Sequence, residues 1–407
     1  MKIHHHHPHC ASRRSFLCAS ASAALAGFRA LGQNTPLTED RFRELSEASQ
    51  NKGVSEPFRG VTTNGAIQPG LFAVRSTGVS TESVRTAAER FLSSLNVEQR
   101  NRTLVPVDSP EWRKWTNTPH YRRSVSFAQM DEKQREAAFG LMRASLSARG
   151  MKLTRDIMRL NETASELAGN PGFGAGEWAY YITILGQPSP AEPWGWQLDG
   201  HHAIINYFVL GDQVVMTPYF AGSDPVHATS GKYKGTIVLQ EEQRRGFEFL
   251  RDLDEAQRSR AVLSFSKTGR NNLAEAFKDN LVLDYAGVPA SALHSVQQRR
   301  LMDLIELYVS NMDEGHARVR MDEVRRYRND TTFAWIGGVN EGGVFYYRIH
   351  SPVILIEFDH QNPGASRFLG EEPGKPSRQH IHVVVRTPNG NDYGKDLLRQ
   401  HYLSHPH

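Results

Sequence analysis

The order of predicted elements occurs twice along this chain, and that repetition constrains the fold more than any other feature. Residues 87–104, AAERFLSSLNVEQRNRTL, resemble residues 244–263, RRGFEFLRDLDEAQRSRAVL. Another amphipathic helix and then a set of strands follow each segment, at an offset of about 150–158 residues in every case. The pattern predicts an α+β fold in which a unit of helices followed by antiparallel strands is duplicated.

Identical residues support the duplication, although amphipathic helices that end in Gln-Arg also resemble one another by chance. The matching positions are Phe91, Leu92, Leu95, Gln99 and Arg100 in the first segment and Phe249, Leu250, Leu253, Gln257 and Arg258 in the second. Duplication predicts two units, about 81–240 and 241–407, related by a pseudo-two-fold axis within one mature domain of residues 33–407.

Hydrophobic periodicity gives the local assignments. Apolar residues at helical spacing predict helices, at 84–95, 131–150, 153–169, 244–263 and 295–312. After residue 176 the pattern is that of strands joined by Pro and Gly turns, with Leu210-Gly211-Asp212-Gln213 as a tight hairpin. Residues 61–74, VTTNGAIQPGLFAV, are predicted to form a strand, a turn and a second strand.

Residues 1–32 are typical of a twin-arginine export signal. Arg13 and Arg14 precede a weakly apolar run rich in Ala and Ser, and cleavage after Ala26 or a few residues later fits the small-residue rule. The alternative is a fortuitous basic patch ahead of a tail. The signal predicts a periplasmic or extracellular protein that engages the export machinery.

Removal of that segment changes what the composition implies. The chain has 48 basic and 44 acidic residues, and four basic residues and no acidic ones lie in 1–32, so the mature protein has 44 of each. A net charge near zero argues against a nucleic-acid partner. Cys10 and Cys18 also lie in the signal, which leaves the mature chain without a disulfide or a thiolate. Its sequence contains no apolar run of membrane-spanning length.

Histidines and a carboxylate at strand ends form the candidate site. His380 and His382 begin the predicted strand 380–386, and residues two apart in a strand point to the same face. The predicted strand 353–359 is expected to pair with it and contains Glu357, a buried carboxylate that needs a partner. Two imidazoles and one carboxylate are a ligand set for zinc or non-haem iron. We expect these three residues to bind a divalent metal, with a metal-free acid–base site or a solvent-facing pair as the alternatives.

Two further segments are assigned to the catalytic surroundings. Asp199-Gly200-His201-His202 precedes an apolar strand of the first unit, and Gly200 would permit a backbone conformation that other residues resist. Adjacent strand residues point to opposite faces, so one of His201 and His202 is expected to join the site as a ligand or general base. Asp392 is expected either to cap the helix that follows it or to orient an imidazole.

Aromatic and basic residues near these strands are candidate ligand contacts. Aromatic residues in strands usually pack across the sheet, but beside a polar site they also stack on ligands. The arginines would clamp a carboxylate or neutralise Glu357. The candidates are Trp196, Tyr346, Arg348 and Arg386.

Three segments, in their order along the chain, resemble the "domain of unknown function 3500" family. They are residues 199–225, 346–359 and 380–394, and the resemblance extends from about residue 57 to the end. Ser351 stands where the family more often has glycine, a loop substitution. The resemblance implies a bacterial, often exported, globular protein of the family's fold, and it supplies no activity, substrate or catalytic residue.

Two functions follow from these predictions. The first is an exported metal-dependent hydrolase or oxidoreductase, in which the ion lowers the pKa of a bound water. The second is a non-catalytic exported protein that binds an unknown small molecule in a cleft lined by aromatic residues and histidines. Convergence of the imidazoles with Glu357 would favour the enzyme, whereas separated imidazoles beside an aromatic groove would favour the binding protein.

Overall fold

A computed structural model describes residues 38–169 and 176–405, so the predicted signal at 1–32 lies outside the described residues. The chain divides into a short unit that ends at Phe42 and a large unit from Arg43 to His407. The described part contains ten α-helices and one mixed sheet of 13 strands, which confirms the α+β prediction.

Periodicity predicted most of the helices, but the predicted helix 244–263 is two helices because Asp254 caps a new one, and the helices at 39–53 and 314–326 were not predicted. The helices are α2 (Glu39–Gly53), α3 (Glu82–Ser94), α4 (Val97–Thr103), α5 (Glu132–Ser145), α6 (Ala148–Ala168), α7 (Gln240–Arg251), α8 (Glu255–Ala261), α9 (Ser295–Val309), α10 (Glu314–Arg326) and α11 (Lys395–Ser404). The predicted boundary near residue 151 was wrong: α6 begins earlier because Ser147 caps it, accepting a hydrogen bond from the backbone N–H of Gly150.

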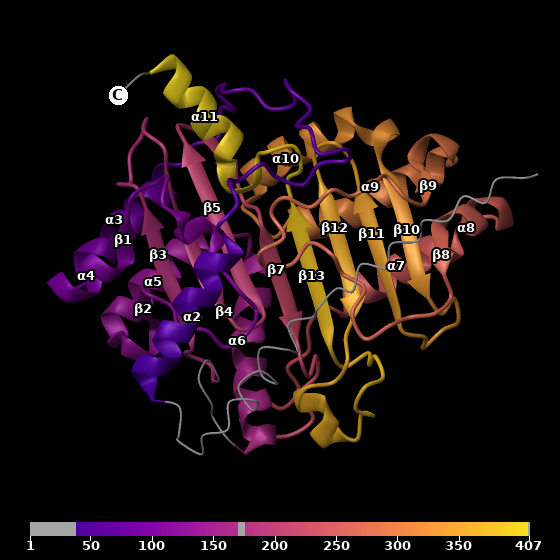
Figure 1. Cartoon of the computed structure of the whole chain (residues 1–407), viewed down its shortest axis with the longest axis horizontal. Coiled ribbons are helices and arrows are strands. Elements are labelled where there is room, and N and C mark those ends of the chain that lie inside the picture. Colours follow the sequence, from indigo (N-terminus) through magenta and orange to yellow (C-terminus); the bar gives the residue numbers. More distant parts are fainter. Residues whose placement is uncertain (1–37, 170–175, 406–407) are drawn as a thin grey trace, which may run out of the picture. The chain divides into compact units, whose positions relative to one another are not determined.

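The sheet lies across the large unit, and its two central strands are β7 and β13 (Figure 1). The strands are β1 (Leu104–Val105), β2 (Val125–Ser126), β3 (Tyr180–Leu185), β4 (Trp194–Gly200), β5 (Ala203–Leu210), β6 (Gln213–Val215), β7 (Tyr219–Ser223), β8 (Val262–Ser264), β9 (Val288–Pro289), β10 (Thr332–Gly337), β11 (Phe345–His350), β12 (Leu355–His360) and β13 (Ile381–Arg386). Their order is β1-β3-β4-β5-β7-β13-β12-β11-β10-β8, and β2, β6 and β9 pair with β3, β5 and β10.

Strand pairing confirms two predictions and contradicts one. Strands β12 and β13 are antiparallel neighbours, as expected, and Leu210 faces Gln213 across the predicted hairpin. The segment 61–74 contains no strand pair; Thr62 forms only an isolated bridge to Val282. Its backbone pairs locally at Val61 and Thr62 with the backbone of Asn389, Leu281 and Leu283, and the Asn389 carboxamide accepts the N–H of Gln68.

Similar helix caps precede the strands in both halves of the sequence. Gln99 and Gln134, at the N3 positions of α4 and α5, close capping boxes and hydrogen-bond each other. Gln257 and Gln297 do the same for α8 and α9. These contacts explain why Gln recurs at matching places in the sequence.

The two faces of the sheet have different coverings. Helices pack on one face, where Trp196 donates to Ser145 of α5 and Tyr347 donates to the carbonyl of Glu242 in α7. Irregular segments cover the other face: the Trp112 carbonyl accepts from Gln197 of β4, and residues 271–275 contact β12 and β13. The second face carries the polar residues of the candidate site.

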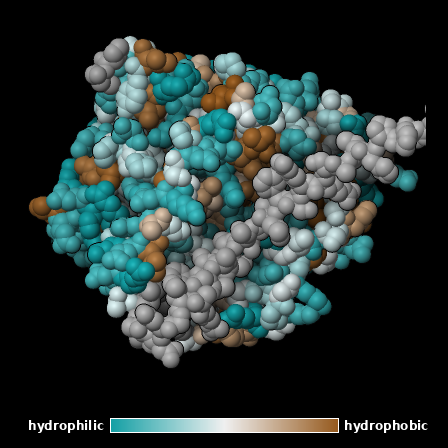
Figure 2. All heavy atoms as spheres, in the orientation of Figure 1, coloured by the Kyte–Doolittle hydropathy of each residue, from teal (hydrophilic) through white to brown (hydrophobic). Residues whose placement is uncertain are grey.

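The surface is mostly hydrophilic on the side seen in Figure 2, with apolar residues scattered in small groups. Among residues 38–169 and 176–405, no helix combines the length and the apolar character needed to span a bilayer.

Candidate metal centre

Three imidazoles from two distant parts of the chain converge on one point. The Nε2 atoms of His202 and His380 are 3.3 Å apart, those of His202 and His382 are 3.2 Å apart, and those of His380 and His382 are 3.0 Å apart. Nitrogen ligands of a tetrahedral zinc ion, at about 2.0–2.1 Å from the metal, lie about 3.3 Å from one another. The triad therefore has the dimensions of a three-histidine metal site with one position left for a further ligand.

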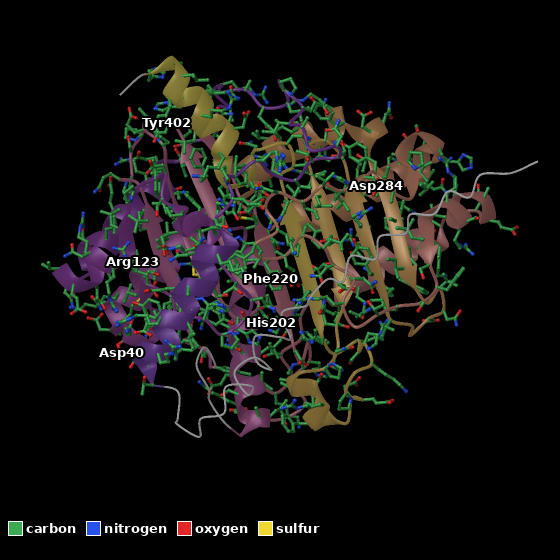
Figure 3. The ribbon with its side chains drawn as sticks, in the orientation of Figure 1. Asp40, Arg123, His202, Phe220, Asp284 and Tyr402 are labelled. Carbon is green, nitrogen blue, oxygen red and sulfur yellow. The ribbon has the colours of Figure 1, made fainter. Side chains whose placement is uncertain are left out.

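Strand geometry and a tight turn place these side chains. His380 directly precedes β13 and His382 is its second residue, so both imidazoles lie on the face away from the helices. His201 and His202 form the two-residue turn between β4 and β5, and His202 has a left-handed φ of 66°. Figure 3 labels His202 and Phe220; the Phe220 ring packs edge-on against His382, with ring centroids 5.0 Å apart.

Two glycines provide room for this arrangement. Gly222 of β7 lies opposite His382, and a Cβ there would be 2.8 Å from the His202 ring and 3.1 Å from the His382 ring. Gly200 has a different role from the one predicted: the residue with the unusual backbone is His202, and Gly200 is needed because a Cβ would be 2.2 Å from the ring of Tyr180.

Hydrogen bonds at the other ring nitrogens determine which tautomers the triad adopts. His382 Nδ1 is 2.6 Å from Oε1 of Glu275, and His380 Nδ1 is 2.6 Å from the carbonyl oxygen of Asn362. A carboxylate and a carbonyl accept only, so both neutral rings carry the proton on Nδ1 and direct an Nε2 lone pair toward the other ring. Two lone pairs 3.0 Å apart repel each other unless a cation lies between them. Metal-bound histidines usually have the same arrangement, in which the ring nitrogen away from the metal donates to a carboxylate or a backbone carbonyl.

The electrostatics of the site keep the His202 and His382 imidazoles neutral and the Glu275 carboxylate ionised. Burial lowers the pKa of His382 to about 4, against the opposing effect of Glu275, and burial also lowers the pKa of His202 well below 6.5. Burial opposes ionisation of Glu275, but its contacts with His382, Arg270 and Asn272 outweigh burial and lower its pKa to about 2. Neutral imidazoles are the form that binds a metal.

Glu357, the predicted carboxylate ligand, has other partners. The register places it opposite Val384, while His382 lies opposite Asp359. Its oxygens accept the backbone N–H groups of Leu273 and Ala274 and the hydroxyl of Tyr346. Two other carboxylates contact the triad, both from the outer side of a ring: Glu275 is 2.6 Å from Nδ1 of His382, and Asp224 is 3.7 Å from Nδ1 of His380.

Asp392 neither caps α11 nor contacts an imidazole through a hydrogen bond. It accepts from the guanidinium of Arg386 at 3.0 Å and from the backbone N–H of Thr387 at 2.7 Å. The N-cap of α11 is Gly394, which makes no side-chain cap. Asp392 is therefore one of the carboxylates that balance a buried arginine.

Two of the predicted ligand contacts bind other protein groups, and two lie away from the triad. Arg386 is buried between Asp279 and Asp392 and donates to the carbonyls of Ala274 and Glu275. Tyr346 donates to Glu357. Trp196 is on the helix-covered face, stacked on Tyr207, and Arg348 lies beside Asp284.

His201 lies next to the triad without being part of it. Its ring lies against that of His202 at a tilt of 32°, with centroids 3.9 Å apart, and its Nδ1 is 2.8 Å from the Asn161 side-chain oxygen. Burial, reinforced by the His380 and His382 rings, lowers its pKa to about 3. A pKa this low makes the His201 ring a weak base at neutral pH, so of the two histidines predicted to offer a ligand or general base, His202 is the one that the structure places in the triad.

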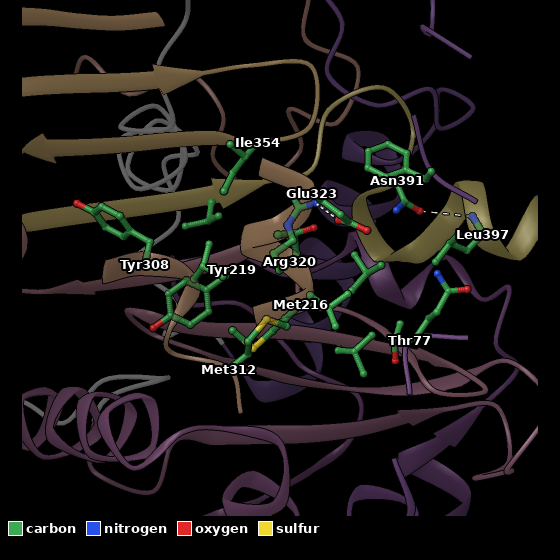
Figure 4. Close-up of a pocket in the computed structure, with 18 of the residues that line it drawn as sticks. Thr77, Met216, Tyr219, Tyr308, Met312, Arg320, Glu323, Ile354, Asn391 and Leu397 are labelled. Atoms are coloured by element: carbon green, nitrogen blue, oxygen red, sulfur yellow. Dashed lines mark hydrogen bonds and ion pairs between the residues drawn. The ribbon is translucent and has the colours of Figure 1, made fainter. Parts of the chain in front are cut away.

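An apolar cavity on the other face of the sheet is separate from the triad (Figure 4). It is lined in part by Met216, Met312 and Ile354. The guanidinium at its edge, that of Arg320, already binds Glu323, the Val353 carbonyl and the Thr387 hydroxyl. We therefore place the candidate chemistry at the triad.

Sequence reasoning missed three polar residues of the site, Glu275, Asn117 and Asp224, and one glycine. Glu275 and Asn117 lie in irregular segments, where no periodicity indicates which strand a side chain reaches. Gly222 did leave a signal, since an isolated glycine inside a strand indicates close approach of another group.

Comparison with known proteins identifies the family. The sequence model described as "Protein of unknown function (DUF3500)" matches residues 77–395, so the chain belongs to this family, as the resemblance predicted. The match includes all three histidines of the triad. No curated protein and no solved structure matches the chain significantly.

Proposed function

We propose that His202, His380 and His382 bind a divalent metal ion, zinc in the first instance, and that the protein is a metal-dependent hydrolase. The observation that supports this proposal most directly is the distance between the three Nε2 atoms, which is 3.0–3.3 Å for each pair. Three protein ligands leave a fourth position for water, whose pKa a zinc ion lowers toward neutrality.

The ligand set favours hydrolysis over iron-dependent oxidation. Non-haem iron oxygenases typically use two histidines and one carboxylate as ligands. Here the carboxylate nearest to His382 is that of Glu275, which accepts the Nδ1 proton of His382 and also binds Arg270 and Asn272. Both of its oxygens therefore already have protein partners. A copper or iron ion in the purified protein would revise the reaction to an oxidoreductase.

Metal analysis tests this proposal. The mature protein, produced without an affinity tag, is expected to contain close to one equivalent of zinc by mass spectrometry, and the His380→Ala/His382→Ala double variant is expected to contain almost none. Glu323→Gln, a substitution at an ion pair near the apolar cavity, is the control. Wild-type protein that stays empty after dialysis against zinc, iron, copper and manganese would refute the site and leave a non-catalytic binding protein as the alternative.

We also propose export and internal duplication. Twin arginines at 13–14 support export, and N-terminal sequencing of the protein from the periplasm or medium is expected to begin near residue 27; an intact N-terminus would contradict it. Two observations support duplication. From one edge the sheet runs β1, β3, β4, β5, β7 in chain order, and from the other edge it runs β8, β10, β11, β12, β13 in chain order. The paired Gln caps occur in both halves. Aligned family sequences should show significant similarity between 81–240 and 241–407, and unrelated profiles would count against it.

A further inference from the structure

Asn117 is a polar residue that faces the triad but cannot ligate a metal through the atom it presents. It lies between α4 and β2, and its Oδ1 accepts the backbone N–H of His202 at 2.8 Å. That bond fixes the orientation of the carboxamide, because only the oxygen can accept. The amide nitrogen Nδ2 is therefore directed at the triad, 3.2 Å from Nε2 of His382.

The segment around Asn117 holds this orientation firmly. Arg122 donates to the carbonyl of Thr116 at 2.6 Å and forms an ion pair of 2.9 Å with Asp199 of β4. Thr116 and Arg122 are both buried, and the Thr116 and Thr118 hydroxyls are hydrogen-bonded to each other. Asn117 is thus presented to the triad from a short stretch that is bound on both sides.

Metal binding would change the partner of the Asn117 amide. In the structure the His382 Nε2 lone pair is the acceptor for Nδ2, and a metal ion would take that lone pair. A fourth ligand in a tetrahedral site lies about 3.3 Å from each of the three nitrogens, so it would be a neighbour of His382 Nε2, as Nδ2 of Asn117 is at 3.2 Å. An oxygen in that position is a suitable new acceptor for the amide, which would otherwise lose its partner at the site.

We propose that Asn117 donates a hydrogen bond to the oxygen atom at the fourth metal position, an inference that rests on the proposed metal site. The site would then select ligands and substrates with an anionic oxygen. Such ligands are carboxylates and the tetrahedral oxyanions that form when water adds to a carbonyl carbon. A fixed donor aimed at developing negative charge is the usual means of stabilising an oxyanion. The hydrogen bond makes Asn117 a determinant of specificity and of transition-state binding.

Cobalt substitution tests the inference without a known substrate. Cobalt(II) bound at the triad reports its ligands through its visible spectrum, and acetate and thiocyanate are the two probes. Acetate ligates through oxygen, whereas thiocyanate ligates through nitrogen or sulfur. In Asn117→Ala we expect acetate to bind at least about tenfold more weakly, since a hydrogen bond to a charged group is lost, and thiocyanate to bind as in the wild type.

Asn117→Asp separates the two roles of the carboxamide. It keeps an oxygen for the His202 N–H and removes the Nδ2 donor, so acetate binding is expected to weaken at least as much as in Asn117→Ala. Unchanged acetate affinity in cobalt-loaded Asn117→Ala would overturn the inference. So would loss of cobalt from both variants, because Asn117 would then serve only to hold the triad. Wild-type protein that binds no cobalt would refute the metal site itself.

Discussion

Glu275 acts on the candidate metal position through the far side of an imidazole. Its carboxylate holds the Nδ1 proton of His382, which increases the electron density at Nε2. We expect Glu275→Gln to bind zinc about 10–100-fold more weakly, the usual effect of losing such a partner, in a competition titration with a chromophoric chelator.

Glu357→Gln is the matched control for this prediction. Glu357 is also a buried carboxylate on the same face of the sheet, but its partners are Tyr346 and the backbone of residues 273–274. Burial raises its pKa, so a neutral side chain suits the site, and zinc affinity is expected to stay near the wild-type value. A loss as large as that of Glu275→Gln would show instead that Glu357 is a ligand, as the sequence predicted.

Strand β13 also anchors the irregular segment that carries Glu275, through Arg386. The guanidinium is fully buried, donates to two carbonyls of that segment and forms ion pairs with Asp279 and Asp392. In Arg386→Met the buried Asp392 would lose its cation, and Asp279 would keep only its ion pair with Arg113. We expect the free energy of unfolding, measured in urea, to fall by about 3–5 kcal/mol, and zinc binding to weaken with it.

An exposed arginine provides the comparison for Arg386. Arg399 in α11 is paired with Asp396 at the surface, and Arg399→Met is expected to change stability by less than about 1 kcal/mol. A similarly small effect of Arg386→Met would show that the arginine is free to bind a ligand, which was its predicted role.

Local periodicity determined how much of the site the sequence could predict. Residues two apart in one strand share a face wherever the strand lies, so His380 and His382 could be placed together. The choice between His201 and His202 required the turn between β4 and β5, and the role of Glu357 required the register of β12 on β13. Glu275 depends on where an irregular segment crosses the sheet, and that path is fixed by long-range hydrogen bonds such as those of Arg386.

At the scale of the whole molecule, a metal ion would link the first half of the sheet to the second. His202 follows β4, whereas His380 and His382 belong to the β13 end of the chain. Zinc in 100-fold excess over its dissociation constant is expected to raise the free energy of unfolding by about 2.7 kcal/mol. Thermal unfolding with zinc and with a chelator measures this stabilisation, which should vanish in His382→Ala. An equal stabilisation of His382→Ala by zinc would contradict the prediction.

The pH dependence of stability is the other whole-molecule property that the buried histidines determine. His350 of β11 is 1% exposed, and burial, reinforced by Arg348, lowers its pKa to about 3. An unfolded chain has a histidine pKa of about 6.5, so between pH 6.5 and 3 the unfolded state binds a proton that the folded state does not. The contribution of the neutral His350 to the free energy of unfolding is therefore fully present above pH 6.5 and is lost as the pH falls toward 3.

Replacement of His350 should remove that share of the pH dependence. Between pH 7 and pH 5 the proton uptake of one such histidine destabilises the folded state by about 2 kcal/mol. The free energy of unfolding in urea, measured on metal-free protein, is therefore expected to fall less between pH 7 and pH 5 in His350→Gln than in the wild type. The difference should be about 2 kcal/mol. His405→Gln, at an exposed position, should behave as the wild type. Identical pH dependence in His350→Gln and wild type would contradict this prediction, because it would mean that the pKa of His350 is the same in the folded and the unfolded protein.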